Sequence, residues 1–406
     1  MNHFGTIYRY EVKKIINKKL TWIVFLICVL CAGMFAAADL TGNYYVDGEV
    51  FDSHYHIFQV DQEYRRALSG KMLDQRLLEE MSEAYGKVPT TVERYTLTDE
   101  YQTYARPYSE IFNIVRLWTQ QWDIDELKAW IPDEEALYAS RIENLEKEWQ
   151  NLRLSDVEKE FWREKETQTD TPVRYLCHDG YSKLISNGIN TLGLLVLLFV
   201  SICMASVFTE EHTRRTDQLI LSGAKGKSVV YWAKLAAGTS VSAACAALLS
   251  IFVFVLVFVV YGAEGFQVSL RLCLYLWASS CTMSLGQACL IAYGILILTA
   301  VFVGGLVLVL SEILHNNIAT LSVGVGMIIA GMVGKVPYQY RVLAQFWDWL
   351  PVRFLNAEHI FDARTISVFG YCFVSWKVVP VLYILVGVAA AIAGKSVYRN
   401  YQVSGR

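Results

Sequence analysis

Charged residues are missing from the longest apolar stretches of this 406-residue chain. Six runs contain no Asp, Glu, Lys, Arg or His. They cover residues 22–38, 189–208, 235–261, 288–310, 318–334 and 378–394. About 20 apolar residues are enough for a helix to cross a membrane, so the runs predict six transmembrane helices. Ion-coupled transporters and intramembrane hydrolases keep ionisable groups inside the membrane, and the absence of such groups argues against both classes.

The cysteines show no metal-binding pattern. Of the nine, only Cys28 and Cys31 have the Cys-x-x-Cys spacing, and both lie inside the first apolar run. Thiols in such a place are expected to pack as small apolar groups. No metal or other cofactor is therefore predicted. A disulfide among the cysteines expected outside the membrane stays open for Cys177, Cys273, Cys281 and Cys372.

The tripeptide Gly226-Lys227-Ser228 has the ending of a phosphate-binding loop but not its beginning. That loop needs Gly-x-x-x-x-Gly-Lys-Ser/Thr between a buried strand and a helix. The first glycine would stand at position 221, which is Leu221, and the preceding residues are charged and polar. The chain is therefore expected to have no catalytic residues and not to hydrolyse ATP by itself.

Charge is divided unevenly along the chain. Residues 40–186 hold 17 Lys and Arg against 29 Asp and Glu, whereas the rest holds 19 against 10. Basic residues gather in the first twenty residues, after the second run and in the C-terminal tail. With six spans these three segments share one face, and Lys and Arg mark the cytoplasmic face. We expect a multi-pass protein of a bacterial plasma membrane with both termini cytoplasmic, and no nucleic-acid partner.

These patterns predict an all-α polytopic membrane protein with a large helical extracellular insert between spans one and two. The expected parts are an interfacial amphipathic helix (1–20), the first transmembrane helix (21–39), the extracellular, mainly helical domain (40–186), the second transmembrane helix (187–208), a cytoplasmic segment (209–229), and transmembrane helices three to six with outer amphipathic segments and a cytoplasmic tail (230–406). An ordinary basic flank is the alternative for residues 1–20. Between 262 and 317 we expect one span rather than two short ones.

The insert carries helix-start signals and many aromatic residues. Ser53 is placed to cap a helix running toward Gly86, and Ser155 with Glu158 has the spacing of a capping box. Five tryptophans fall inside the insert: Trp118, Trp122, Trp130, Trp149 and Trp162. We expect them to form a helical core, and an aromatic surface that grips an amphipathic substrate or lipid head groups is the alternative.

The segment after the second run, VFTEEHTRRTDQLILSGAKGKSVVYWAKL, resembles the membrane (permease) subunits of ATP-binding-cassette transporters of the type-2 exporter family. The matching features are Glu210 and Glu211, a Thr-x-x-Leu-Leu-like stretch at 216–221, a polar turn at 222–227 and Lys234. The family often has Gly before the threonine, where this chain has Arg215. The N-terminal helix, LVLSEILHNNIATLSV, FWDWLPVRFLNAEHIF and the basic tail are similar too, so the resemblance covers the chain outside the insert.

The resemblance implies that residues 209–229 couple the chain to a separate cytoplasmic ATPase, which binds the ATP. The implied coupling residues are Glu210, Glu211, Arg214, Arg215, Asp217, Lys225 and Lys227. Glu312 and His315 would make a contact on the inner turn between spans four and five. A second copy or a paralogous permease subunit and membrane lipid are the other implied partners.

Two functions remain open on the sequence. The first is export of a peptide, lipid-like or drug-like substrate, driven by the ATPase subunit. The alternative is a non-transporting membrane protein whose extracellular domain senses a ligand or scaffolds partners, with the ATPase serving signalling. For 209–229 itself, a solvated basic loop that only sets the topology is the simpler possibility.

Overall fold

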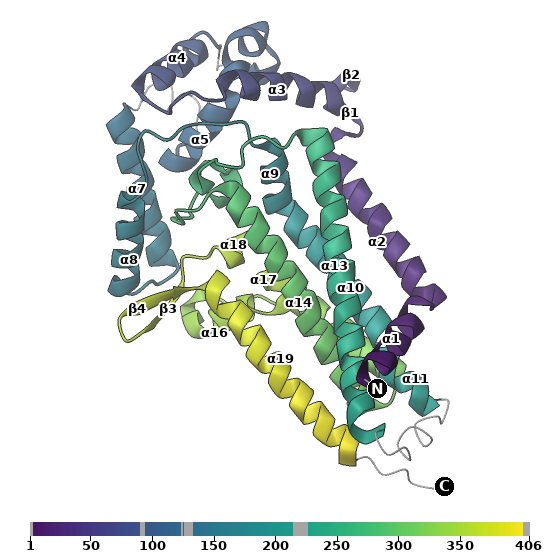
Figure 1. The fold of residues 1–406 in the computed structure, drawn as a ribbon. Coiled ribbons are helices and arrows are strands. Elements are labelled where there is room, and N and C mark those ends of the chain that lie inside the picture. Colours follow the sequence, from purple (N-terminus) through teal and green to yellow (C-terminus); the bar gives the residue numbers. More distant parts are fainter. Residues whose placement is uncertain (1–2, 90–93, 123–124, 126–132, 214–225, 401–406) are drawn as a thin grey trace.

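The computed structural model describes residues 3–89, 94–122, 125, 133–213 and 226–400, which are mostly helical (Figure 1). Five helical segments are long and apolar enough to cross a membrane. They are Lys19–Leu40, Asp179–Glu211, Ser228–Tyr261, Leu285–Leu314 and Ser375–Asn400. The predicted helical class is confirmed, and the five segments are compatible with a multi-pass membrane protein.

The long helices form a bundle centred on α14 (Leu285–Leu314). Around it lie α2 (Lys19–Ala37), α10 (Ile189–Met204), α13 (Tyr231–Tyr261) and α19 (Ser375–Asn400). Helix α14 packs against α10, α13 and α19, and α2 packs against α10 and α13. Two glycines bring α13 and α14 close together. A Cβ atom at Gly304 would lie 2.5 Å from Ser242 Oγ, and one at Gly238 would lie 2.6 Å from Leu308 Cδ1.

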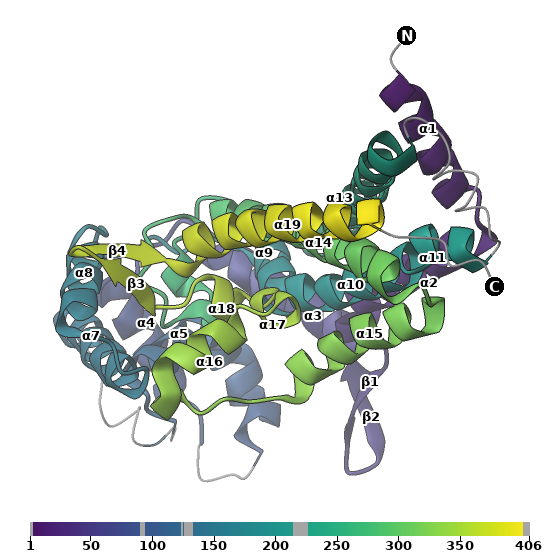
Figure 2. The same ribbon diagram turned by 90° about the horizontal axis from the view of Figure 1, so that it is seen from below.

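The two ends of the bundle carry different parts of the chain (Figures 1 and 2). At one end lie α1 (His3–Ile16) and α11 (Ser206–Thr213), and we call it the N-terminal end. The helices of residues 40–186 cover the opposite end, which we call the insert end.

The apolar run predicted as the fifth span forms a helix that is shorter than each of the five candidate spans. It forms α15 (Asn317–Val333), whose 17 residues span about 25 Å. Helix α15 packs against α10 and α14. The chain then bends by 110° into the segment Tyr338–Asp348, and only together do the two pieces have the length and composition of a span.

The insert consists of a short hairpin followed by helices. The hairpin pairs β1 (Asn43–Val46) with β2 (Glu49–Ser53). The helices are α3 (His54–Leu68), α4 (Gln75–Gly86), α5 (Ser109–Thr119), α7 (Glu134–Asn151), α8 (Asp156–Thr167) and α9 (Asp179–Lys183). The sequence analysis missed the hairpin, although Asp47-Gly48 is a typical two-residue turn and both residues have positive φ.

The helix-start signals of the insert are confirmed, but one helix length is wrong. The Ser53 side chain accepts a hydrogen bond from His56 N, and Ser155 with Glu158 forms a full capping box. The single helix expected from Ser53 to Gly86 is broken into α3 and α4, because Gly70 has φ +97°. There the chain pairs with the returning segment, and Gly70 N donates to Tyr175 O at 2.8 Å.

Aromatic residues form the insert's core, as predicted for three of the five tryptophans. Trp118, Trp149 and Trp162 are at most 2% exposed, whereas Trp122 is 56% exposed. Trp130 lies outside the described residues.

The insert is attached to the bundle through α8. Trp162 Nε1 donates to Ala363 O at 2.6 Å. The Glu158 carboxylate is 1% exposed, and its Oε1 accepts from Thr365 N and Thr365 Oγ1, each at 2.9 Å, and from Arg341. The same carboxylate that caps α8 therefore holds the chain ahead of α19.

Residues 262–284 contain no second span, which confirms the single span expected between 262 and 317. Short 3-10 turns at Leu270–Leu272 and Leu274–Leu276 lead to α14. Ahead of α19 lie α16 (Arg341–Asp348), α17 (Pro351–Phe354), α18 (Ala357–Ile360) and a hairpin of β3 (Thr365–Val368) and β4 (Tyr371–Val374). All nine cysteines are free, and the described residues hold no cluster of three or more metal-ligating side chains.

We predict that Gly180→Ala destabilises the fold. A Cβ atom there would lie 2.1 Å from the backbone carbonyl oxygen of Gly262, so the chain after α13 would have to move. Such overpacking typically costs about 1–3 kcal/mol. Thermal unfolding of the detergent-solubilised chain should show it. The control is Gly294→Ala, which adds the same atom to α14 where nothing lies within 4 Å. Equal melting temperatures for the two variants would contradict the packing.

Candidate functional site

A fully buried lysine joins three helices at the N-terminal end. Lys234, near the start of α13, is 0% exposed. Its Nζ atom lies 3.0 Å from Glu11 Oε2 and 2.6 Å from Glu211 Oε1. Glu11 belongs to α1 and Glu211 to α11, so one ammonium group holds both helices against α13. The ring of Phe208 lies 5.6 Å from the same nitrogen.

Two further lysines extend these contacts, one on α1 and one in the short connection between α1 and α2. Lys14 Nζ lies 3.0 Å from Glu211 Oε1, and Lys18 Nζ lies 2.7 Å from Glu210 Oε2. Lys18 also donates to Ser206 Oγ at 2.9 Å. Three carboxylates thus face three ammonium groups. We call the six residues the charged junction: Glu11, Lys14, Lys18, Glu210, Glu211 and Lys234.

The buried part of the charged junction is stable only as a complete set of Glu11, Glu211 and Lys234. Moving an ion out of water costs several kcal/mol unless partners compensate, and removing one partner leaves another charge buried alone. Burial lowers the pKa of the Lys14 ammonium, but the carboxylates of Glu211 and Glu11 outweigh this and raise it overall. Because the Lys14 pKa is higher in the folded chain, the protonated ammonium group stabilises the fold at any pH below the unfolded pKa of about 10.4. This contribution is lost only as the pH rises through the folded-state pKa. Lys14 is therefore charged at neutral pH.

Hydrogen bonds hold α11 against α14 as well. Helix α10 ends at Met204, and Ala205 separates it from α11. The Ala205 carbonyl accepts from Ser311 Oγ at 2.8 Å and from Thr209 Oγ1 at 3.0 Å. Ser311 Oγ in turn accepts from Thr209 N at 3.3 Å. Helix α11 is thus fixed to α1, α13 and α14 together.

The inner turn between α14 and α15 consists of His315 and Asn316. His315 ends α14 with φ +50°, and Asn316 caps α15 by accepting from Ala319 N. Glu312 is fully buried, and its Oε1 lies 3.8 Å from His315 Nε2. Of the two residues predicted for a partner contact here, Glu312 faces the interior, and the His315 side chain is 31% exposed.

The structure places only part of the predicted coupling set. Glu210 and Glu211 lie on α11, where their carboxylates bond within the chain. Lys227 lies in the helical turn Gly226–Val230, which leads directly into α13, and its side chain is outside the description. The remaining predicted coupling residues lie outside the described residues: Arg214, Arg215, Asp217 and Lys225.

Three members of the charged junction were not predicted as site residues. Glu11, Lys14 and Lys18 stand three and four positions apart, a spacing that places side chains on one side of a helix. That signal was available, but Lys14 and Lys18 also fit a basic flank that only sets topology. Nothing in the sequence indicated that their partners lie almost 200 residues further along.

Comparisons with known proteins leave this chain without an assigned family. No protein-family model matches it, and no curated protein matches it.

We predict that Lys234→Met lowers the free energy of unfolding by about 3–5 kcal/mol, because it leaves two buried carboxylates without their shared cation. Thermal unfolding of the solubilised chain measures the loss. Lys147→Met is the matched control, since Lys147 pairs with Glu143 and both side chains are more than 60% exposed. Such a surface pair contributes about 0–1 kcal/mol. Similar losses in the two variants would show that the buried pairing stabilises the fold no more than an exposed ion pair does.

Proposed function

We propose that this chain is the membrane subunit of an ATP-driven exporter of the type-2 family, and that a separate ATPase docks on residues 209–229. The observation that carries the proposal is the fixation of α11 by the charged junction and by Ser311. A short charged helix at the end of a candidate span is thereby bonded to three other helices. A solvated loop that only sets the membrane topology would need no such attachment.

The attachment suits mechanical coupling. Force applied to α11 by a closing ATPase would be passed to α10, α1, α13 and α14 as rigid-body motion, since all of them contact it directly. The apolar runs offer no charged residues for an ion gradient to act on, which favours an external energy source. In this proposal the partner binds and hydrolyses ATP, and the chain itself needs no cofactor.

The proposal includes a topology of six crossings. Helix α15 would be the fifth crossing helix along the chain and would make six together with the five long segments, and α16 to α18 would lie at the insert end. Both termini would face the cytoplasm and the insert would lie outside the plasma membrane, as the basic flanks favour. A second copy or a paralogous subunit would complete the transporter within the lipid bilayer.

A non-transporting sensor linked to an ATPase is the alternative, and it would use the same α11 contact. Reconstituted vesicles separate the two functions. A transporter moves a peptide, lipid-like or drug-like substrate across the membrane when ATP is supplied, whereas a sensor changes only the ATPase rate.

We predict that the double variant Arg214→Glu, Arg215→Glu weakens ATPase docking at least about tenfold, equivalent to about 1.4 kcal/mol. These residues follow α11 directly in the sequence and belong to the proposed docking segment. Co-purification of the ATPase and its turnover in the complex are the measurements. The control is Arg76→Glu, an exposed change in the insert. Unchanged docking and turnover in the double variant would remove the coupling assignment.

We predict that the turn before α15 and the β3–β4 turn that follows α18 lie on opposite sides of the membrane. Asn316→Cys lies in the turn before α15, and Phe369→Cys lies in the β3–β4 turn at a position that is 98% exposed. A membrane-impermeant maleimide should label the second variant in intact cells, and the first only after permeabilisation. Because the chain already has nine cysteines, labelling is measured as the increase over the chain without the added cysteine. If both positions react from the same side, α15 does not cross.

A further inference from the structure

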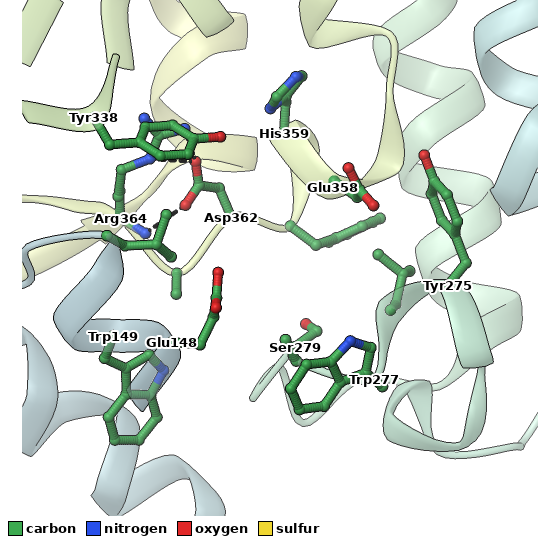
Figure 3. Close-up of a pocket in the computed structure, with 15 residues that line it drawn as sticks. Glu148, Trp149, Tyr275, Trp277, Ser279, Tyr338, Glu358, His359, Asp362 and Arg364 are labelled. Atoms are coloured by element: carbon green, nitrogen blue, oxygen red, sulfur yellow. Dashed lines mark hydrogen bonds and ion pairs between the residues drawn. The ribbon is translucent and has the colours of Figure 1, made fainter. Parts of the chain in front are cut away.

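A cavity of about 360 Å³ lies at the insert end, where the insert meets the bundle. Its walls come from four parts of the chain (Figure 3): the end of α7, residues 275–279 ahead of α14, Tyr338 ahead of α16, and residues 358–364 ahead of β3. The volume is at the small end of the roughly 300–1,000 Å³ typical of small-molecule sites. All the lining residues belong to the described part of the chain.

Two carboxylates in the cavity lack a cation. Figure 3 shows Glu148 and Glu358 turned toward the central space. No Lys, Arg or His among the described residues pairs with either of them. Among the described residues, the Glu148 carboxylate accepts a hydrogen bond only from the Asn151 side-chain amide, at 3.3 Å. Burial raises the pKa of the Glu358 carboxyl, as expected where lost hydration is not replaced by a counter-charge.

The cavity's own cations are already engaged. Arg364 Nε donates to Asp362 Oδ2 at 2.6 Å, and Arg364 Nη2 lies 2.7 Å from Asp348 Oδ2. Burial lowers the pKa of His359, so its ring is neutral at pH 7. A positive group brought by a ligand would therefore meet unpaired negative charge at Glu148 and Glu358.

Aromatic rings complete that side of the cavity. Tyr275 and Trp277 lie around the space near Glu358, across from Tyr338 (Figure 3). The Tyr338 ring already stacks on Arg364, whose Cζ lies 4.9 Å from the ring centre. Tyr275 and Trp277 hold no such cation, and aromatic faces beside carboxylates are the usual surroundings of a bound ammonium group.

The opposite wall presents hydrogen-bond donors. Trp149 is 1% exposed and lines the cavity, yet its Nε1 has no acceptor among the described residues. The Nη1 atom of Arg364, also 1% exposed, has none either. A buried donor without an acceptor costs about 1–3 kcal/mol, so a ligand oxygen at this wall would be favourable.

We propose that the cavity binds a small organic ammonium ion that also carries an oxygen acceptor. The ammonium group lies between Glu358, Glu148, Trp277 and Tyr275, and the oxygen accepts from Trp149. This chemistry belongs both to free amino alcohols and to choline-type lipid head groups. The inference does not depend on the ATPase proposal, because the cavity and the charged junction lie at opposite ends of the bundle.

Calorimetry on the full chain in dodecyl maltoside tests the proposal with two matched probes. Choline carries the charge, and 3,3-dimethylbutan-1-ol has the same shape without it. We expect choline to bind at least about tenfold more tightly, because the cation meets carboxylates that lack a counter-charge and aromatic faces. Equal affinity for the two probes, or no binding of choline, overturns the proposal.

Matched variants locate the site. Glu358→Gln and Glu148→Gln should each weaken choline binding about tenfold while leaving the neutral probe unchanged. Neither residue has a cationic partner among the described residues, so both variants should fold normally. Glu143→Gln removes the same charge from an exposed position on α7 and is the control. If it weakens choline binding as much as Glu358→Gln does, the cavity is not the site.

A third probe distinguishes the sources of the ligand. Dihexanoylphosphatidylcholine offers the same head group on a short lipid. Binding at least tenfold tighter than that of choline supports a lipid head group, and equal or weaker binding supports a free amine. Docking of the ATPase is not involved in any of these measurements, so the two proposals can fail separately.

Discussion

The buried ammonium group of Lys234 sets the arrangement of the N-terminal end. It is shared by Glu11, 223 positions earlier, and Glu211, 23 positions earlier. Burying either carboxylate is strongly unfavourable until α13 brings Lys234 to it, because the charge would be unpaired. Helices α1 and α11 are therefore correctly placed only once α13 is present. A buried ion pair adds little net stability over an apolar contact, but it tolerates few alternative arrangements.

The same constraint explains why the chain needs so few polar contacts within the bundle. Away from the ends, the helices meet through small residues such as Gly238 and Gly304, which let backbones approach but do not fix how far one helix slides along another. Charged and hydrogen-bonding groups are concentrated at the two ends. The register of the helices is thus determined there.

Much of the fold could be predicted from the sequence because its main signals are local. Charge-free runs located the five long helices, and the Ser155–Glu158 capping box placed the start of α8. The break at Gly70 and the 110° bend after α15 were not apparent, since both depend on tertiary neighbours. Gly70 pairs with the returning Tyr175, and the chain after α15 turns so that Val352 can meet Gly331. The β1–β2 hairpin had a local signal in Asp47-Gly48 that a helical reading of the insert concealed.

The candidate site was less predictable than the fold. Glu210 and Glu211 were singled out through the resemblance to a family, but their bonding partners could not be deduced from spacing, because an ion pair across almost 200 residues leaves no local pattern. The cavity at the insert end was not predicted at all. Its walls come from four separate parts of the chain, and each part alone has the pattern of an ordinary aromatic or acidic stretch.

The Glu158 carboxylate has one more consequence. One of its oxygens completes the cap of α8, and the other receives Thr365 and Arg341 from the chain that leads into α19. The insert is therefore no interchangeable module added to a finished membrane domain. Grafting residues 40–186 onto another bundle would separate α8 from the groups that neutralise its capping residue, and the donor chain would lose the acceptor that orients its last helix. An insert and a final span joined in this way have to change together.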